Sequence, residues 1–354
     1  MKRVGCLWPE IVRFQNLLSA ARSARKGKRF QPNVLRFEHD LEGNLLRIQR
    51  GLMEKTWTPG PYAEYFIHEP KTRKISAAPY ADRVVHHALV RVIEPVFEKR
   101  FIDHSYACRK GKGTHRAVDV FQKFLRRYDW CLKMDIEKFF PSMDHAVLMD
   151  VIRRKIKCQD TLWLIETIIS SSNPQEPIWR YFEGDDLFAP AKRRRGIPIG
   201  NLTSQFFANV MLDPLDHFVT ERLRIGAYVR YCDDFALFSA CKEDLAEAKK
   251  RIGDFLEAYR LMPHPKKCHV FPTRRGSPFL GYRVLKTHKK LLPDNVRRFR
   301  KRAKKMVQSF EAGSLTADKV SASLKSWIAH AEHAETYRLR ERLFSDLVFT
   351  RRQV

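Results

Sequence analysis

Three carboxylates stand at the ends of apolar stretches that lie far apart in the sequence. Asp233 and Asp234 are adjacent in YVRYCDDFALF (228–238), and Asp135 ends the apolar run CLKMD. Carboxylates in apolar surroundings are costly unless a cation compensates them, and adjacent carboxylates repel each other. Three acids at strand ends could hold a pair of Mg²⁺ ions about 4 Å apart. Such ions would activate a hydroxyl and stabilise an in-line phosphoryl displacement.

A solvent-facing turn is the competing interpretation, because Asp-Asp pairs are common in turns. The composition of the chain favours a catalytic role for these acids over a solvent-facing turn. The chain carries 67 Lys and Arg against 40 Asp and Glu, for a formal charge of +27. An excess of this size predicts a polyanionic partner, with nucleic acid first and an anionic membrane surface second. No amphipathic anchor supports the membrane, so we expect no membrane partner.

Composition also bounds the class of protein. With 354 residues and 44% hydrophobic residues, the chain is expected to fold around two or three subdomains. It has no run of 18 apolar residues and no recognisable signal peptide. Its seven cysteines show no CxxC spacing, which predicts reduced thiols and a cytoplasmic location.

Periodicity predicts a mixed chain. Residues 1–60 read as helices, and two short strands follow in YAEYFIHEP and RKISAAP. Further helices are expected from Asp82 as N-cap, after the GKG loop, over 145–171, from Asn201 or Thr203, over 243–259 and from 294 onward. Strands are expected at 130–135, in the pair 228–238, at HVFP and at FLGYRV. The fold class is therefore α+β, with one antiparallel sheet carrying a helix layer in a ferredoxin-like order.

The segment YCDDF resembles the YxDD box of reverse transcriptases, and other motifs follow that family's order over residues 60–285. RKISAAPYADRVVHHAL resembles the fingers segment, LKMDIEKFFPSMD the first palm acid motif, and GIPIGNLTSQFFANVML the helix beside the active site. LMPHPKKCHV and SPFLGYRV resemble the lysine motif and the primer-grip hairpin. The resemblance implies a right-hand polymerase with fingers, palm and helical thumb.

Departures from the pattern of group II intron-type enzymes indicate which group of reverse transcriptases the chain resembles most. That pattern reads PQG and then SP, whereas this chain has Pro198-Ile199-Gly200 and then Ser204-Gln205. These residues, IDHSYACRKGKGTH and SWIAHAEHAET are similar to reverse transcriptases of diversity-generating retroelements. The chain ends after the expected thumb, without an added maturase, endonuclease or RNase H segment, which argues against a complete intron-encoded protein.

The resemblance implies a metal site and a nucleotide site. Asp135 and Asp233 are the firmer ligands of two Mg²⁺ ions, with Mn²⁺ as a possible substitute, Asp234 as an outer ligand and the carbonyl of Ile136 as a further one. Phe140, five residues after Asp135, is the expected steric gate that selects dNTPs. The alternative is that Phe139 and Phe140 are both core rings.

Further residues are expected to bind the dNTP and to set fidelity. Lys71 and Arg73 match the triphosphate clamp, in which Arg73 can fork two phosphate oxygens. The alternative is a solvated basic turn. Lys267 resembles the lysine that meets the triphosphate, ahead of its neighbour Lys266. Ile199 offers shape where a Gln would offer hydrogen bonds, so weaker discrimination is expected there and at Gln205.

Nucleic-acid contacts are expected in the primer grip and the thumb. The primer grip contributes Gly281 and Tyr282. A basic helix contributes phosphate contacts from Arg297, Arg298, Arg300, Lys301 and Lys304, with a merely solvated face as the alternative. His86 and His87 are expected to pack rather than ligate. The run Lys192–Arg195 could contact RNA or a protein, and the sequence leaves that choice open.

The expected domains are an N-terminal helical segment (1–60), fingers (61–130), palm (131–290) and thumb (291–354). The expected function is error-prone copying of a template-repeat RNA into cDNA by a bacterial, archaeal or phage-encoded enzyme. Its partners would be template RNA, the primer-template duplex, dNTPs and a small, basic, oligomeric accessory variability protein. A retron or phage-defence reverse transcriptase and a catalytically silent RNA-binding protein are the alternatives.

Overall fold

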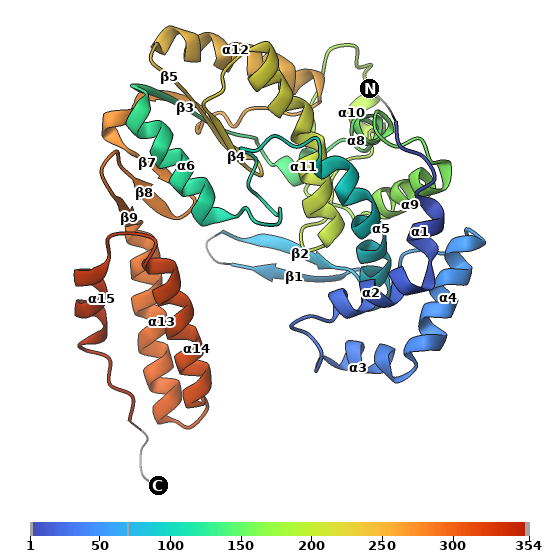
Figure 1. Cartoon of the computed structure of the whole chain (residues 1–354), viewed down its shortest axis with the longest axis horizontal. Coiled ribbons are helices and arrows are strands. Elements are labelled where there is room, and N and C mark those ends of the chain that lie inside the picture. Colours follow the sequence, from blue (N-terminus) through green and yellow to red (C-terminus); the bar gives the residue numbers. More distant parts are fainter. Residues whose placement is uncertain (1–2, 69–70, 351–354) are drawn as a thin grey trace.

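The chain begins with a layer of helices. In the computed structural model, which describes residues 3–68 and 71–350, the first four helices are α1 (Trp8–Val12), α2 (Phe14–Ala24), α3 (Pro32–His39) and α4 (Leu41–Met53). Their apolar faces pack against the long helix α5 (Tyr80–Glu98), which also contacts α11 (Leu202–His217). This layer lies at the lower right of Figure 1 and supports one side of the molecule.

A two-stranded ribbon lies between α4 and α5 in the chain. Strands β1 (Ala63–Ile67) and β2 (Arg73–Ala77) pair antiparallel, with Ala63 opposite Ala77. All five residues of β1 are exposed, whereas Ile75 and Ser76 of β2 are buried. We call β1–β2 the fingers ribbon. It crosses the centre of Figure 1 below the main sheet.

The central sheet, here called the palm sheet, has four antiparallel strands in the order β4-β5-β3-β6. They are β3 (Trp130–Asp135), β4 (Tyr228–Tyr231), β5 (Asp234–Ser239) and β6 (His269–Pro272). Between β3 and β4 the chain forms α11, and between β5 and β6 it forms α12 (Lys242–Ala258). This order confirms the expected ferredoxin-like arrangement.

Both faces of the palm sheet are covered. Leu132, Met134, Phe235 and Leu237 point into one core with α11 and α12. The intervening residues Cys131, Ala236 and Phe238 belong to a second core with α6 (Thr114–Arg127). Because strand side chains alternate, Asp135 and Asp234 share the second face, at the end of the sheet.

The palm is completed by short helices beside α11. These are α7 (Phe139–Ser142), α8 (His145–Arg153), α9 (Gln159–Ser170), α10 (Ala189–Lys192) and the π-helix η1 (Phe218–Arg222). The region 145–171, expected to be helical, forms the two helices α8 and α9, and Ile156 between them bridges to Val4. The expected N-cap Asp82 is wrong. Helix α5 begins at Tyr80 after Pro79, and the buried Asp82 carboxylate accepts a hydrogen bond from Gly60 N (2.8 Å).

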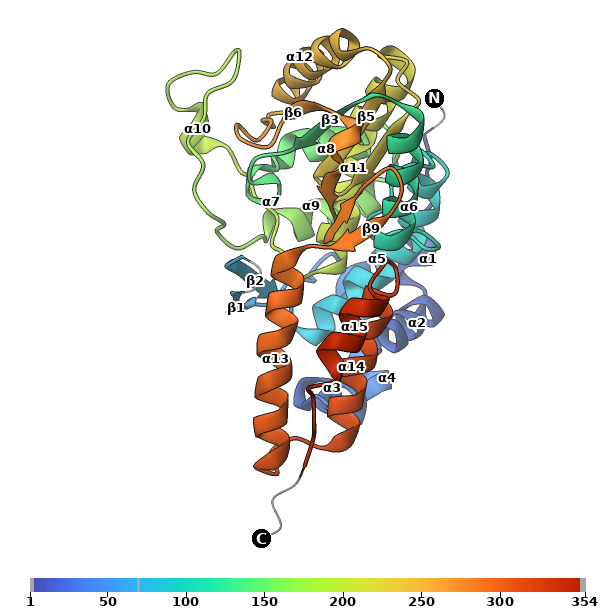
Figure 2. The same cartoon turned by 90° about the vertical axis from the view of Figure 1, so that its left-hand side faces the viewer.

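The C-terminal third combines a small sheet with three helices. Strands β7 (Ser277–Phe279), β8 (Tyr282–Val284) and β9 (Lys289–Leu291) follow the short helix η2 (Thr273–Arg275). The helices are α13 (Pro293–Glu311), α14 (Ala317–Ala331) and α15 (Tyr337–Phe344), which we call the thumb and which stand below the palm sheet in Figure 2. Phe299 of α13 stacks on Trp327 of α14, with ring centroids 3.8 Å apart.

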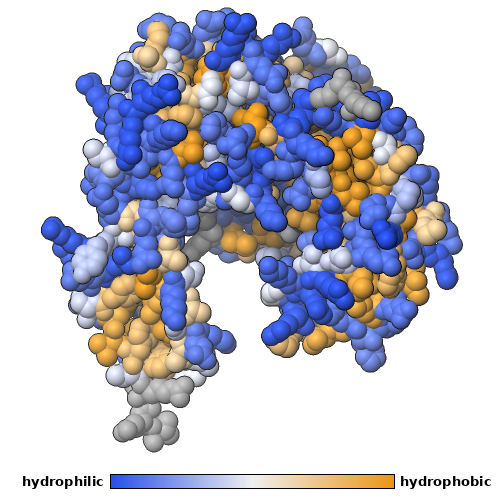
Figure 3. Space-filling model, viewed as in Figure 1, coloured by the Kyte–Doolittle hydropathy of each residue, from blue (hydrophilic) through white to orange (hydrophobic). Residues whose placement is uncertain are grey.

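The fold leaves an open hollow between the thumb and the N-terminal helices, visible in Figure 3. Among the described residues, no helix is both long and apolar enough to cross a membrane. The molecule therefore has a mixed α+β architecture in which palm sheet, fingers ribbon and thumb surround one concave side (Figures 1 and 3).

Candidate active site

The palm sheet brings the three predicted carboxylates together. Asp135 is the last residue of β3 and lies directly opposite Asp234, the first residue of β5. Because Tyr231 pairs with Asp234, the turn that joins β4 to β5 consists of Cys232 and Asp233. Asp233 therefore lies in the turn, directly before Asp234. Residues separated by about a hundred positions in the chain therefore meet at one end of the sheet.

The turn has a defined backbone. Cys232 has a φ of 57°, which lies in the left-handed region. A tight two-residue hairpin requires such a residue because its twist then matches that of the strands. The turn thereby places Asp233 outside the ladder.

Burial and mutual repulsion act on these acids. Burial, reinforced by the charge of Asp135, raises the pKa of Asp233 above its usual range. Burial also raises the pKa of Asp234 to about 6, against the opposing effect of Lys133 and with added repulsion from Asp135 and Asp233. Carboxylates held together in this way favour a proton or a metal ion between them.

A cleft of about 710 Å³ opens beside the acids and contains most of the predicted nucleotide site. Its walls come from the fingers ribbon, the turn after β3, the loop before α11 and the loop before β6. The predicted residues that line it are Lys71, Arg73, Asp135, Ile136, Ile199, Asp233 and Lys267. Cations and carboxylates therefore face each other across one cavity, as a triphosphate with bound metal requires.

Lysines neutralise two of the acids. Lys267 Nζ lies 2.9 Å from Asp135 Oδ2. Lys133, which the sequence analysis did not single out, lies 3.3 Å from Asp234 Oδ2 and also donates to Pro278 O at 2.9 Å. Its position two residues before Asp135 on the same strand face was the available signal. Asp234 lies outside the residues that line the cleft, so of the three predicted carboxylates only Asp135 and Asp233 face it.

Ile199 is fixed by the fingers ribbon. Its carbonyl accepts a hydrogen bond from Ser76 N of β2 (2.9 Å), and Asn201 bonds both Ser76 O (3.0 Å) and Ala78 N (3.1 Å). Asn201 is the N-cap residue of α11, as expected, but its side chain serves β2 instead of the helix. Gly200 has a φ of 121°, and a Cβ there would lie 2.9 Å from Ile75, so glycine is required.

Besides Asp234, the predicted residues Gln205, Phe140 and Tyr282 also lie outside the residues that line the cleft. Gln205 is exposed on α11. Phe140 packs partly buried against the core, whereas its neighbour Phe139 is among the cleft-lining residues. The steric-gate assignment to Phe140 therefore stays a prediction, and Phe139 is the alternative residue for this role.

Tyr282, expected in the primer grip, is fully buried. Its hydroxyl lies 2.9 Å from Nδ1 and 2.8 Å from the carbonyl O of His330, so it links the β7–β8 hairpin to α14 of the thumb.

The predicted phosphate contacts of the thumb are solvent-exposed. They all lie on α13 and comprise Arg297, Arg298, Arg300, Lys301 and Lys304. Gly281 of the primer grip has a φ of 92° and lies beside His330 and Asn295. His86 is buried and His87 half-buried, in agreement with the packing role expected of them.

The acids suit a hard divalent cation. Among the described residues, no group of three or more His, Cys, Asp or Glu side chains is placed so that it could hold a metal ion by itself. Mg²⁺ does not require such a group, because it commonly takes one or two carboxylates together with substrate phosphates and water. In addition, Asp234 Oδ1 is buried without a hydrogen-bond partner, which leaves an acceptor for a cation or its water.

Comparison with known proteins converges on one family. The profile described as "Reverse transcriptase (RNA-dependent DNA polymerase)" matches residues 67–284, which contain the three acids, Lys71 and Lys267. Protein YkfC of Escherichia coli is 22% identical over 275 residues, covering 66% of this chain and 69% of that protein.

Two further relatives are named for introns. Group II intron-encoded protein LtrA of Lactococcus lactis is 26% identical over 222 residues, covering 61% of this chain and 34% of LtrA. Mitochondrial nuclear intron maturase 1 of Arabidopsis thaliana is 26% identical over 209 residues, covering 47% of this chain and 29% of the maturase. The similarity therefore spans about a third of each of these two relatives.

Proposed function

Because the chain belongs to the reverse transcriptase (RNA-dependent DNA polymerase) family, we propose that it extends a primer on an RNA template using dNTPs bound in the cleft beside Asp135 and Asp233. The observation that carries this proposal is the register that sets Asp135 opposite Asp234, with Asp233 in the adjoining turn and Lys71, Arg73 and Lys267 in the same cavity.

The carboxylates of Asp135 and Asp233, together with the carbonyl of Ile136, would hold two Mg²⁺ ions, or Mn²⁺ in their place. Asp234 would act as an outer ligand. When bound, the ions lower the pKa of the primer 3′-hydroxyl and stabilise charge on the α-phosphate. The new bond joins the 3′-oxygen to the α-phosphorus, the bond to the β-phosphate breaks, and pyrophosphate leaves.

The cations of the cleft bind and orient the triphosphate. Arg73 offers a planar fork for two phosphate oxygens, and Lys71 offers a point charge. Lys267 pairs with Asp135 at 2.9 Å, and its side chain is 40% exposed. It can therefore exchange this carboxylate for a phosphate oxygen when substrate enters.

The finer proposal is error-prone copying for a diversity-generating retroelement. Its support is Ile199, an apolar side chain in the cleft where group II intron-type enzymes have Gln. An aliphatic side chain selects by shape alone, so a mispaired nucleotide loses less than it would against a hydrogen-bonding partner. The template would be a repeat RNA, the product mutagenised cDNA, and a small basic oligomeric accessory protein would take part.

Primer extension on RNA with Mg²⁺ and dNTPs, followed by sequencing of the cDNA, tests both levels. Errors concentrated at template adenines would support the retroelement assignment. Accurate cDNA would retain the polymerase and reject mutagenic copying. A chain that binds RNA but gives no product, even with the accessory protein and cognate RNA, would favour the binding-only alternative.

A further inference from the structure

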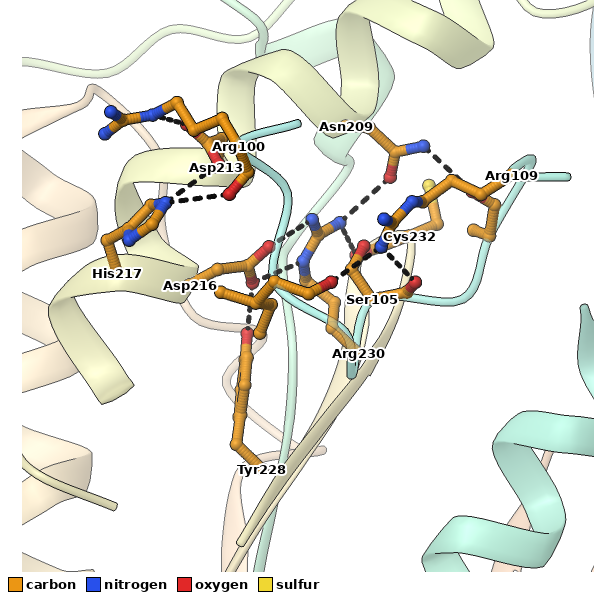
Figure 4. Close-up of polar contacts among 12 residues, drawn as sticks. Arg100, Ser105, Arg109, Asn209, Asp213, Asp216, His217, Tyr228, Arg230 and Cys232 are labelled. Atoms are coloured by element: carbon orange, nitrogen blue, oxygen red, sulfur yellow. Dashed lines mark hydrogen bonds and ion pairs between the residues drawn. The ribbon is translucent and has the colours of Figure 1, made fainter. Parts of the chain in front are cut away.

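A buried ion pair lies directly behind the turn that carries Asp233. Arg230 of β4 and Asp216 of α11 both have side chains with 0% exposure. The guanidinium forks the carboxylate, with Nε 2.6 Å from Oδ1 and Nη2 2.5 Å from Oδ2 (Figure 4). Sequence reasoning passed over Arg230, although an arginine inside an apolar strand signals a buried acidic partner.

The remaining nitrogen of Arg230 points to the turn. Nη1 donates to the backbone carbonyl of Cys232 (3.2 Å) and to Asn209 Oδ1 (3.2 Å). The Cys232 carbonyl belongs to the peptide that joins Cys232 to Asp233. Holding this carbonyl fixes the plane of that peptide, and thus the direction in which Asp233 leaves the turn.

The arginine itself has little freedom to move. Its backbone N donates to His104 O (2.9 Å), and its carbonyl accepts from Tyr106 N (2.9 Å). Asp216 is held in turn, because Tyr228 Oη donates to its Oδ1 (2.8 Å). The chain from α11 through Asp216 and Arg230 to Cys232 therefore consists of buried, directional contacts.

Stability alone is a poor reason for such a pair. Removing two charges from water is costly, and apolar replacements of buried ion pairs are often neutral or stabilising. A fork that also reaches a turn carbonyl supplies geometry that an apolar side chain cannot supply.

We propose that Arg230, held by Asp216, is a positioning residue that sets the Cys232–Asp233 peptide and thereby aims Asp233 at Asp135. This inference rests on the proposed role of Asp233 as a metal ligand. Arg230 is fully buried and is not among the residues that line the cleft, so it acts on the site only through the turn.

Two variants test it. Arg230→Lys keeps the positive charge beside Asp216 but removes the fork. Arg230→Met with Asp216→Asn removes both charges and leaves an acceptor for Tyr228. Asp213→Asn is the matched control, because Asp213 lies one turn earlier on α11 and pairs with Arg100 instead of Arg230. Circular dichroism and melting identify which variants fold.

The readouts are kcat, dNTP KM, template-primer affinity and Mn²⁺ binding followed by electron paramagnetic resonance. In folded variants of Arg230 we expect kcat to fall about 10- to 100-fold and the Mn²⁺ dissociation constant to rise about tenfold. Template-primer affinity and the control should stay at the wild-type level.

A folded Arg230 variant with wild-type kcat and Mn²⁺ affinity would overturn the inference, as would a loss of kcat that only follows the folded fraction. If the double variant does not fold, Arg230→Lys decides alone. A wild-type chain that makes no DNA would instead overturn the proposed function. In that case unchanged Mn²⁺ binding in Arg230→Lys would still reject the positioning role.

Discussion

Two hairpins face the same cleft and are built in opposite ways. The fingers ribbon has two strands, exposes all of β1 and presents Lys71 and Arg73. The β4–β5 hairpin lies in a four-stranded sheet with buried strands on either side of its turn, and it presents Asp233. A two-stranded ribbon in water is only marginally stable by itself, whereas the β4–β5 hairpin belongs to a larger sheet that is packed on both faces.

The two hairpins differ in packing because carboxylates and cationic side chains need different support. Carboxylates that share a metal must keep their geometry to a fraction of an ångström, so they belong on a packed sheet. Long cationic side chains that grip a phosphate reach their target through several rotatable bonds and tolerate a mobile support. The buried hairpin should therefore control the rate of chemistry, and the exposed ribbon should control substrate affinity.

The strongest test of the buried hairpin is Asp233→Asn. Removal of a metal ligand should lower kcat by about 10³-fold or more, since the lost electrostatic stabilisation amounts to several kcal/mol. Primer extension under single-turnover conditions measures this. The exposed Asp254 provides the matched control, because Asp254→Asn should leave the rate unchanged. A rate within tenfold of wild type in Asp233→Asn would contradict the assignment.

On the exposed ribbon, Arg73→Ala should raise the KM for dNTPs about 10- to 100-fold with a smaller change in kcat, since charge-assisted hydrogen bonds contribute about 1.5–3 kcal/mol. Steady-state kinetics with varied dNTP gives both constants. The exposed Arg50 supplies a control of the same charge. A large fall in kcat at unchanged KM would break the proposed division between the two hairpins.

The palm also contains the two adjacent rings, Phe139 and Phe140. If Phe140 is the gate, Phe140→Ala should reduce discrimination against ribonucleotides by about 10- to 100-fold in competition assays. Phe139 is 2% exposed, so its replacement by alanine should instead lower the free energy of unfolding by about 3–5 kcal/mol. Ribonucleotide incorporation by a folded Phe139 variant alone would transfer the gate to Phe139.

Ile199 contacts the fingers ribbon and also lines the cleft. Its carbonyl accepts a hydrogen bond from Ser76 N of β2. Ile199→Gln should lower misincorporation by a few-fold, up to about tenfold, by adding a hydrogen-bonding side chain. Sequencing of cDNA from both enzymes measures the change. Ile199→Leu should keep the wild-type error frequency, because it also offers only shape, and equal errors in all three would reject Ile199 as the cause.

The smallest effect concerns stability without metal. Because the pKa of Asp234 is raised to about 6 from a usual 3.8, the folded chain binds the proton more tightly than the unfolded chain. The free energy of unfolding should therefore fall as the pH rises from about 4 through 6, with a Tm change of a few °C. Asp234→Asn should flatten this slope, and Mg²⁺ should restore Tm chiefly at neutral pH. Differential scanning fluorimetry measures both, and an unchanged slope in the variant would contradict burial as the cause.

The sequence predicted the parts of the site that depend on local pattern. The strand ending at Asp135, the paired strands around Asp233 and the helix after Asn201 are all confirmed, because alternation and capping are local properties. The cleft also brings Lys71, Arg73 and Lys267 to the acids, as the family order implied.

The features that could not be predicted from the sequence depend on contacts between elements that are distant in the chain. Nothing local indicates that Arg230 pairs with Asp216 across a helix and a strand, or that Tyr282 turns inward to His330. Gln205 was expected in the site, but the helix turn places it on the exposed face of α11. Such placements follow from tertiary packing, which overrides local pattern.

The left-handed residue of the β4–β5 turn is Cys232, and this affects how the protein should respond to oxidants. Burial, reinforced by the neighbouring carboxylate of Asp233, raises the pKa of the Cys232 thiol well above its usual value. The thiolate is the form that oxidants and alkylating reagents attack, so a thiol kept protonated reacts slowly. Peroxide or maleimide should therefore modify the exposed Cys6 and Cys241 first. Of the seven cysteines, the one beside Asp233 should therefore be slow to oxidise.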